Sequence, residues 1–428
     1  MWGASRMALM LVLADDLTGA ADCGVTCAGH GLETMLVFGD RGGESDAEAL
    51  AVDANTRSLG ADEAAAETGR LLRAHLRSEE TLLYKKIDST LRGNIGAELA
   101  ATLAVRRALT RAGIQAGERI VAVLAPAFPA TGRTTVNGRQ LVDGMPIEES
   151  GLFASGELAT GSDLALMVRL AGLQAALMEL ELVRGADETL RTAMKAAAQD
   201  ADVLVCDAET EDDLRRIAEA SMTLGRGTVW AGSGGLARHL PVAAGLARGT
   251  GSAKESRRVA GPVLFVVGSG SIVSQRQVEM LGNESDTIVM KIAAEALLGG
   301  EQSSRWAAAV VELEGALGSG RDVAVMPDPD VRIDSAMGPA LSAGLGMLVQ
   351  SVADRVGALV VTGGETARAV FEAWGVNRLR LIGEVESGLP YSVTEGWKRE
   401  LPVLTKAGGF GGPQSLLRCR DFLRGSGD

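Results

Sequence analysis

Short apolar runs alternate with helix-like segments along almost the whole chain, and this alternation is the strongest constraint on the fold. In the first half, helix-like segments cover 19–28, 61–76 and 95–109, and apolar runs cover 8–14, 33–38, 49–52, 81–84 and 120–125. Strand–helix alternation is typical of a parallel sheet with helices on both faces. We therefore predict an α/β fold of two domains, each with a mainly parallel sheet flanked by helices.

A polar, glycine-bearing segment at 247–261 separates two such series and has the composition of a linker. The chain has 428 residues, which is long for one typical domain. We predict one domain over 1–246 and a second over 262–428, joined by the linker 247–261. After a weakly periodic stretch at 134–163, the remaining apolar runs lie at 180–183, 203–206, 228–231, 263–267, 287–292, 323–326, 358–361, 379–382 and 402–404.

Four apolar runs of the first half end in loops rich in charged and hydroxyl side chains, at 15–20, 53–57, 85–94 and 126–135. The carboxyl ends of parallel strands share one edge of a sheet, and ligands bind there. The loop at 85–94 is the most informative, because it holds two lysines, an arginine, an aspartate and two hydroxyls. Cations suit a carboxylate and Asp88 suits hydroxyls, so we predict a site for a small, hydroxylated anion.

Three glycine-rich loops end apolar runs of the second half, at 268–271, 362–366 and 405–411. Glycine lets a backbone approach a phosphate closely, and exposed amides at a helix N-terminus bind anions. Lys406 adds a positive charge to the third loop. These loops predict a phosphate site, with ordinary tight turns as the alternative.

The glycine loops lack the features of two common nucleotide-binding motifs. The chain contains no Gly-Lys dipeptide, which excludes a Walker A loop. Val273 stands where the dinucleotide fingerprint needs glycine or alanine, and the next apolar run ends near Lys291, where an NAD enzyme needs an acidic residue. These features disfavour a dehydrogenase, and an ATP enzyme with these loops must lie outside the P-loop class.

Composition excludes several other classes of protein. The formal charge is −13 with lysine and arginine scattered, which argues against a nucleic-acid partner. No apolar run is long enough to span a membrane, and the run at 8–14 ends in two aspartates rather than a signal cleavage site. Four cysteines without a matching second ligand pair exclude a zinc site of the usual spacing. We predict a cytoplasmic protein with no membrane partner, and a homo-oligomer is compatible with the chain.

The motifs at 14–20, 85–94 and 126–135, with those at 362–366, 383–390 and 405–411, resemble the four-carbon acid-sugar kinases, in order along nearly the whole chain. The resemblance implies an N-terminal domain that binds a sugar acid and a C-terminal domain that binds ATP with Mg²⁺. It implies phosphorylation of the terminal hydroxyl of threonate, erythronate or 3-oxo-tetronate. The segment 145–163 departs from the family pattern, which leaves the substrate among these acids open.

On this resemblance, substrate contacts fall on Asp16, Arg57 and residues 86–89, and ATP contacts fall on Ser271 and residues 363–366 and 408–409. Neighbouring groups of suitable chemistry complete two candidate sets. The substrate set is Asp15, Asp16, Arg57, Lys86, Asp88, Ser89 and Arg92. The nucleotide set is Ser269, Ser271, Gly363, Gly364, Glu365, Thr366, Lys406, Gly408 and Gly409.

In this hypothesis, Arg57, Lys86 and Arg92 hold the substrate carboxylate, while Asp16 or Asp88 is the catalytic group that orients or deprotonates the hydroxyl. The sequence does not decide between the two aspartates, and it does not identify protein ligands for Mg²⁺. Two alternatives remain, an NAD-dependent sugar-acid dehydrogenase and a sugar-acid-binding protein without catalysis.

Overall fold

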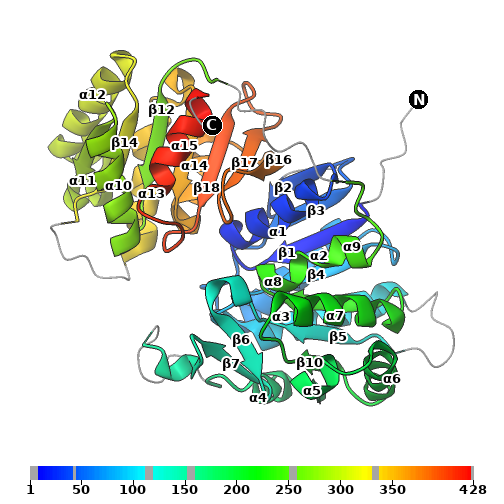
Figure 1. The fold of residues 1–428 in the computed structure, drawn as a ribbon. Coiled ribbons are helices and arrows are strands. Elements are labelled where there is room, and N and C mark those ends of the chain that lie inside the picture. Colours follow the sequence, from blue (N-terminus) through cyan, green and yellow to red (C-terminus); the bar gives the residue numbers. More distant parts are fainter. Residues whose placement is uncertain are drawn as a thin grey trace, which may run out of the picture. The chain divides into compact units, whose positions relative to one another are not determined.

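The structure is a computed structural model that describes residues 8–41, 45–110, 119–151, 160–249, 258–329 and 337–425. The chain divides into two compact units, residues 1–250 and 251–428, and this division falls inside the segment predicted as a linker. Figure 1 shows the first unit from blue to green and the second from yellow-green to red. Each unit has a mainly parallel sheet with flanking helices, so the predicted fold class is confirmed.

The sheet of the first unit has the strand order β2-β3-β1-β4-β11-β5-β10-β9, and the paired strands run parallel. The strands at its centre are buried along their length, as expected when helices cover both faces. The bounds are β1 Met10–Ala14, β2 Thr34–Phe38, β3 Ala49–Asp53, β4 Leu82–Lys86, β5 Ala122–Ala125, β9 Ala175–Met178, β10 Val203–Cys206 and β11 Val229–Gly232.

Helices of the first unit begin where the sequence supplies capping groups. Asp16 caps the first helix by accepting from the amide of Gly19, and Thr210 caps a later one in a capping box with Asp213. The bounds are α1 Leu17–Gly29, α2 Ala61–His75, α3 Ile95–Thr110, α4 Leu164–Leu170, α5 Leu180–Val183, α6 Asp187–Ala197, α7 Glu211–Ser221, α8 Gly234–Ala237 and α9 Leu240–Ala243. Side chains of α2, α3 and α4 share one apolar core with β1, β4 and β5.

Two parts of the first unit differ from the prediction. The apolar run at 180–183 is the helix α5, and the strand lies just before it as β9. The first three residues of β9 are only partly buried at the sheet edge and give a weak apolar signal. The weakly periodic stretch after 133 contains a small antiparallel sheet of β6 Arg133–Val136, β7 Arg139–Val142 and β8 Met145–Pro146. Residues 152–159 of that stretch lie outside the described residues.

The sheet of the second unit has the strand order β13-β14-β12-β15-β18-β17-β16. The first five strands run parallel, and β17 runs antiparallel to both of its neighbours. The sequence pattern did not predict β17, which begins at a proline, a residue tolerated at the first position of a strand. The bounds are β12 Val263–Val267, β13 Ile288–Ile292, β14 Val323–Pro327, β15 Ala358–Thr362, β16 Arg378–Glu384, β17 Pro390–Thr394 and β18 Pro402–Lys406.

Helices cover both faces of the second sheet, because successive side chains of its central strand β12 point to opposite faces and are all buried. Val263, Phe265 and Val267 of β12 share an apolar core with residues of α10 and α15, while Leu264 and Val266 are buried as well. The bounds are α10 Ile272–Glu284, α11 Ala294–Gly299, α12 Ser304–Gly318, α13 Gly338–Gln350, α14 Gly364–Trp374 and α15 Ser415–Arg424. Among the described residues no helix is both long and apolar enough to cross a membrane.

In both units the chain leaves two adjacent strands toward opposite sides of the sheet. In the first unit β1 leads to β2 on one side, and its neighbour β4 leads to β5 on the other. In the second unit β12 leads to β13 and its neighbour β15 leads to β16 in the same divergent way. Ligands of open α/β sheets bind beyond the carboxyl ends of strands at such points, so the topology marks one position in each unit.

Candidate functional site

In the first unit, the register of three parallel strands brings the polar loops together. Ala14, the last residue of β1, pairs with Asp53 at the end of β3 and with Lys86 at the end of β4. The loops that follow these strands therefore start side by side. The sequence prediction that these loops share one edge of the sheet is confirmed.

Arg57 links the two aspartates of the first loop. Its guanidinium donates to Asp15 at 2.7 Å and 2.9 Å in a bidentate pair, and to Asp16 at 2.8 Å. Burial by itself lowers the pKa of Arg57, but Asp16 and Asp15 outweigh this effect and raise the pKa well above its usual value. Arg57 is thus held as a permanent cation beside two carboxylates.

Asp16 and Lys86 meet over Gly19 in the first turn of α1. The Asp16 carboxylate caps the helix at the Gly19 amide (2.9 Å) and accepts from the Thr18 hydroxyl (2.6 Å). Asp16 Oδ1 and Lys86 Nζ both lie 2.6 Å from the position that a Cβ of residue 19 would take, so only glycine leaves room for the ammonium. Burial raises the pKa of Asp16, but the opposing effect of Arg57 and Lys86 is larger, so the pKa is lowered overall.

Asp88 and Arg92 form the other side of this cluster. Arg92 donates to Asp88 at 2.5 Å, and the Thr90 hydroxyl donates to the same oxygen at 2.5 Å. Burial raises the pKa of Asp88, whereas Arg57 and Arg92 lower it, and the net shift leaves the carboxyl ionised near neutral pH. About half of the Arg92 side chain is exposed, so its guanidinium is accessible from solvent.

The loop that carries Asp88 and Ser89 contains a strained residue and is held by a side chain that is distant in the sequence. Leu91 is buried with a positive φ of 59°, which is costly for a branched residue and is held by the surrounding structure. Gln140 of β7 donates to the Ser89 carbonyl at 2.8 Å and accepts from Thr135 at 2.7 Å. Within the described part of the chain, the Ser89 hydroxyl makes no hydrogen bond.

The lysine pair at the end of β4 is divided between two roles. Side chains alternate across a strand, so consecutive lysines point to opposite faces. Lys85 is fully buried and forms an ion pair with Glu98 of α3 at 2.5 Å. Lys86 lies with Asp15 and Asp16, which raise its pKa against the opposing effect of burial. Lys86 is therefore the lysine available to a substrate.

Sequence reasoning missed two residues of this cluster. Gln140 lies in a stretch without clear periodicity, and only the fold brings it to Ser89. Asp22 lies on α1 three residues after Gly19, and Lys86 is close enough to affect its pKa, which burial raises overall. The i, i+3 spacing from Gly19 was the one signal that could have pointed to Asp22.

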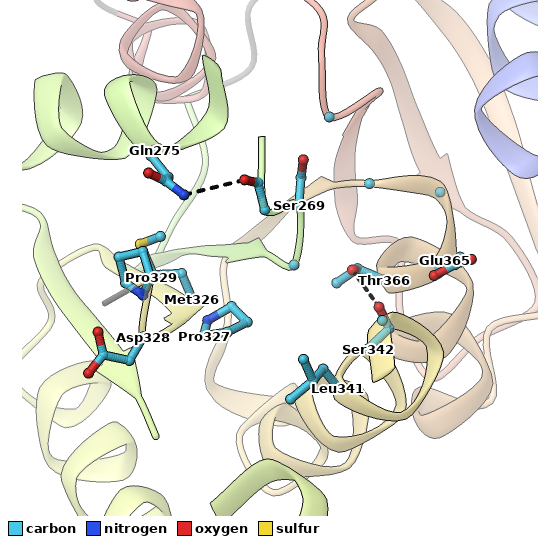
Figure 2. Close-up of a pocket in the computed structure, with 16 residues that line it drawn as sticks. Ser269, Gln275, Met326, Pro327, Asp328, Pro329, Leu341, Ser342, Glu365 and Thr366 are labelled. Carbon is cyan, nitrogen blue, oxygen red and sulfur yellow. Dashed lines mark hydrogen bonds between the residues drawn. The ribbon is translucent and has the colours of Figure 1, made fainter. Parts of the chain in front are cut away.

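The second unit has a cavity of about 560 Å³ at the carboxyl ends of its central strands. Figure 2 shows Ser269 and Gln275 on one side, Glu365 and Thr366 on the other, and Leu341 below them. The described residues that line it include two carboxylates and no lysine or arginine: Gly268, Ser269, Gly270, Gln275, Met326, Pro327, Asp328, Pro329, Gly338, Leu341, Ser342, Gly363, Gly364, Glu365, Thr366 and Gly408.

Glycines let the loops around this cavity touch one another. A Cβ on Gly268 would collide with the Thr366 hydroxyl, and one on Gly408 would collide with Ser269. Gly363 caps α14 with a φ of 100°, a conformation that favours glycine. Gly270 and Gly409 differ, because a Cβ on either would meet open space. The cavity is thus bordered by backbone that a ligand could approach closely.

Hydrogen bonds fix the third glycine loop against α10. The carbonyl of Gly408 accepts from the hydroxyls of Ser271 and Ser274, both at 2.8 Å. The Lys406 ammonium donates to the same carbonyl at 3.2 Å and to those of Ala407 and Phe410 at 2.9 Å and 3.0 Å. Burial lowers the pKa of Lys406 to about 8. In this structure Lys406 shapes its own loop and is not among the residues that line the cavity.

The predicted nucleotide residues are therefore brought together only in part. Six of the nine predicted residues line the cavity: Ser269, Gly363, Gly364, Glu365, Thr366 and Gly408. Ser271 caps α10 by accepting from the Ser274 amide at 3.1 Å and orients the Gly408 loop. Among the described residues no group of three or more histidine, cysteine, aspartate or glutamate side chains could hold a metal ion.

Two family models match separate parts of the chain. A family model described as a sugar-binding N-terminal domain matches residues 10–240, and one described as a nucleotide-binding C-terminal domain matches residues 264–416. The D-threonate kinase of Cupriavidus necator is 39% identical over 95% of this chain and 96% of its own length. The D-threonate kinase of Salmonella typhimurium is 33% identical over 97% and 98%. Further relatives are named 3-oxo-tetronate kinase and D-erythronate kinase.

A solved structure of a Salmonella typhimurium protein has the same fold. The likeness covers 97% of this chain and 99% of that protein, with a TM-score of 0.78 and 21% sequence identity. At this identity the likeness establishes the shared fold of the two chains.

Proposed function

The chain belongs to the family of four-carbon acid-sugar kinases, and from this premise we propose that it transfers the γ-phosphoryl group of ATP to the terminal hydroxyl of a four-carbon sugar acid. D-threonate is the first candidate, because three relatives that match over almost their whole length are D-threonate kinases. The observation that carries the proposal is the pair of sites at equivalent topological positions, one charged and one built from glycine loops.

The charged site of the first unit suits the acid. Lys86 and Arg92 are cations with a donor available for a carboxylate, and Arg57 adds a third charge beside them. Asp16 and Asp88 are ionised, so they accept hydrogen bonds from substrate hydroxyls rather than bind the carboxylate. The Ser89 hydroxyl, which has no hydrogen bond within the described part of the chain, adds a further polar contact.

The glycine-loop cavity of the second unit suits a nucleotide. Its volume of about 560 Å³ is in the range of small-ligand sites, and the N-terminal turns of α10, α13 and α14 border it. Backbone amides at helix N-termini bind phosphate without needing a basic side chain. Glu365 and Asp328 are the carboxylates that would hold Mg²⁺, which takes one or two carboxylates together with phosphate oxygens. When bound, Mg²⁺ neutralises phosphate charge.

The proposed reaction needs positioning, charge neutralisation and a proton acceptor. The hydroxyl oxygen of the acid forms a bond to the γ-phosphorus, and the bond from that phosphorus to the bridging oxygen of ADP breaks. The hydroxyl proton passes to Asp16 or Asp88, both of which are ionised in the folded protein. Arg57 and Lys86 hold the substrate carboxylate.

The test is to incubate the full chain with ATP–Mg²⁺ and each of D-threonate, D-erythronate and 3-oxo-tetronate, and to follow ADP release. Formation of a phosphate monoester should be detected by phosphorus NMR in the same mixtures. We expect acid-dependent ADP release, highest with D-threonate. Absence of phosphoryl transfer to all three acids, by a protein that is folded and binds ATP, would contradict the proposal.

A further inference from the structure

The glycine-rich loop after β11 opens on the same sheet edge as the charged site but has no part in the functions assigned so far. β11 lies between β4 and β5, and Gly234 begins α8 directly after it. A Cβ on Gly234 would collide with Asp22 Oδ2 and would lie 3.1 Å from the Phe128 ring. Residue 234 must therefore be small because the Asp22 carboxyl group occupies that space.

Asp22 extends the charged site along α1. It lies three residues after Gly19, and side chains at this spacing share one face of a helix. The face at Gly19 is the one against which the Lys86 ammonium lies. Arg238 also acts on the Asp22 carboxyl group, and its guanidinium lies 4.9 Å from the centre of the Phe128 ring. Residues from the segments that follow β1, β5 and β11 thus surround the Asp22 carboxyl group.

Asp22 differs from the other carboxylates of the site in its hydrogen bonds. Asp15, Asp16 and Asp88 each accept from arginine, whereas the Asp22 side chain accepts no hydrogen bond from the described residues. Burial raises the pKa of Asp22, and Lys86 and Arg238 oppose the rise without cancelling it. A partly buried carboxyl group without a partner costs free energy, which a ligand can recover by hydrogen bonding.

A hydroxyl is the ligand group that fits this position. It can donate to an ionised carboxylate or accept from a neutral carboxyl, so it suits both protonation states of Asp22. A substrate carboxylate would be repelled by ionised Asp22 and is better placed at the cations of the site. We infer that Asp22 hydrogen-bonds a hydroxyl of the sugar acid and selects the hydroxylated acid over its deoxy analogue, an assignment that rests on the proposed function.

The test compares D-threonate with 3,4-dihydroxybutanoate and 2,4-dihydroxybutanoate, which lack the hydroxyl at carbon 2 or carbon 3. For wild type and Asp22→Ala, the Kd of each acid is measured by calorimetry and kcat/KM by ADP release. We expect the preference for D-threonate over one of the two analogues to fall at least tenfold in Asp22→Ala, while the preference over the other is unchanged. Asp22→Asn, which keeps hydrogen-bonding atoms, should recover part of the loss.

Two further variants keep the test decisive. Gly234→Ala, whose methyl group would displace the Asp22 carboxyl group, should reproduce the lost preference if Asp22→Ala fails to fold. Asp62→Ala, at an exposed position in the first turn of α2, is the matched control and should change neither preference. An equal loss for all three acids, or unchanged preferences in folded variants, would overturn the assignment. If wild type discriminates among the acids in Kd but transfers no phosphate, the kinase proposal fails and this one stands.

Discussion

The two units place their sites at the same topological position but build them from different chemistry. In the first unit, strand ends deliver ionised side chains that are paired with one another, such as Arg57 with Asp15 and Arg92 with Asp88. In the second unit, the described cavity lining holds no lysine or arginine, and glycine loops bring backbone to its surface. A small acid offers few atoms and needs strong charge-assisted contacts, whereas a polyphosphate can be held by many amides.

The comparison predicts the largest effect for Arg57→Ala. Loss of a charge-assisted contact of roughly 1.5–3 kcal/mol should weaken D-threonate binding by about 10- to 100-fold, and ATP affinity should be unchanged. The variant should also be less stable, because Asp15 and Asp16 lose the cation that they share. Calorimetry with each ligand, beside a melting curve, gives the three quantities.

Arg70→Ala is the matched control for this prediction. Arg70 also pairs with two carboxylates, Glu67 and Asp40, but it does so at an exposed position outside the site. Its removal should leave both affinities as in wild type. Unaltered D-threonate affinity in Arg57→Ala would break the link between the charged cluster and the acid.

A side chain at Gly270 should affect the nucleotide alone. Gly270 lines the cavity, and a Cβ there meets no protein atom within 4 Å, so Gly270→Val should fold with wild-type stability. We expect ATP affinity to fall about tenfold or more, since the added group stands where backbone and phosphate approach.

Gly408→Val serves as the contrasting variant. Its Cβ would collide with Ser269, so we expect it to lose stability and nucleotide affinity together. The two variants therefore separate a glycine needed for the ligand from one needed for packing of the loops. Wild-type ATP affinity in folded Gly270→Val would show that this glycine loop is an ordinary turn.

Lys406 should give the second unit a distinctive dependence of stability on pH. Its pKa in the folded protein is about 8, below the usual value of 10.5, so between these values the unfolded chain binds more protons and stability rises with pH. Asp16 and Asp88 affect stability in the acid range instead. Because their pKa values are lowered in the folded protein, the stability that they contribute is present above about pH 4 and is lost in stronger acid.

The measurement is urea denaturation of wild type and Lys406→Met at pH 7.5 and pH 9.5. Wild type should gain up to about 2 kcal/mol relative to the variant between these pH values. An equal change of stability with pH in the two proteins would show that the pKa of Lys406 is not lowered in the folded protein.

Much of the architecture could be predicted because parallel strands buried on both faces have a strong sequence signal. The runs at 263–267 and 203–206 correspond to β12 and β10, and the polar loops after β1, β3 and β4 share one edge of the sheet. The edge strand β9 and the antiparallel β17 were missed, because partial burial and a leading proline weaken that signal.

The fine assignment of side chains needed the structure. Alternation along β4 implies that Lys85 and Lys86 face opposite ways, but only the buried position of Glu98 shows which of them is taken up in the core. In the same way, the sequence placed Lys406 beside a phosphate, whereas its ammonium donates hydrogen bonds to carbonyls of its own loop. Asp22 was missed because helix residues far from a loop carry no motif.

The most direct test that the first unit binds the acid and the second binds the nucleotide is hydrogen–deuterium exchange of the unmodified protein with each ligand alone. D-threonate should protect residues 15–20, 53–57 and 85–94, and ATP–Mg²⁺ should protect residues 268–271, 363–366 and 408–409. Each ligand should leave the amides of the other set close to their exchange rates in the free protein. Protection of the glycine loops by D-threonate, or of the charged loops by ATP–Mg²⁺ alone, would contradict the assignment of the two sites.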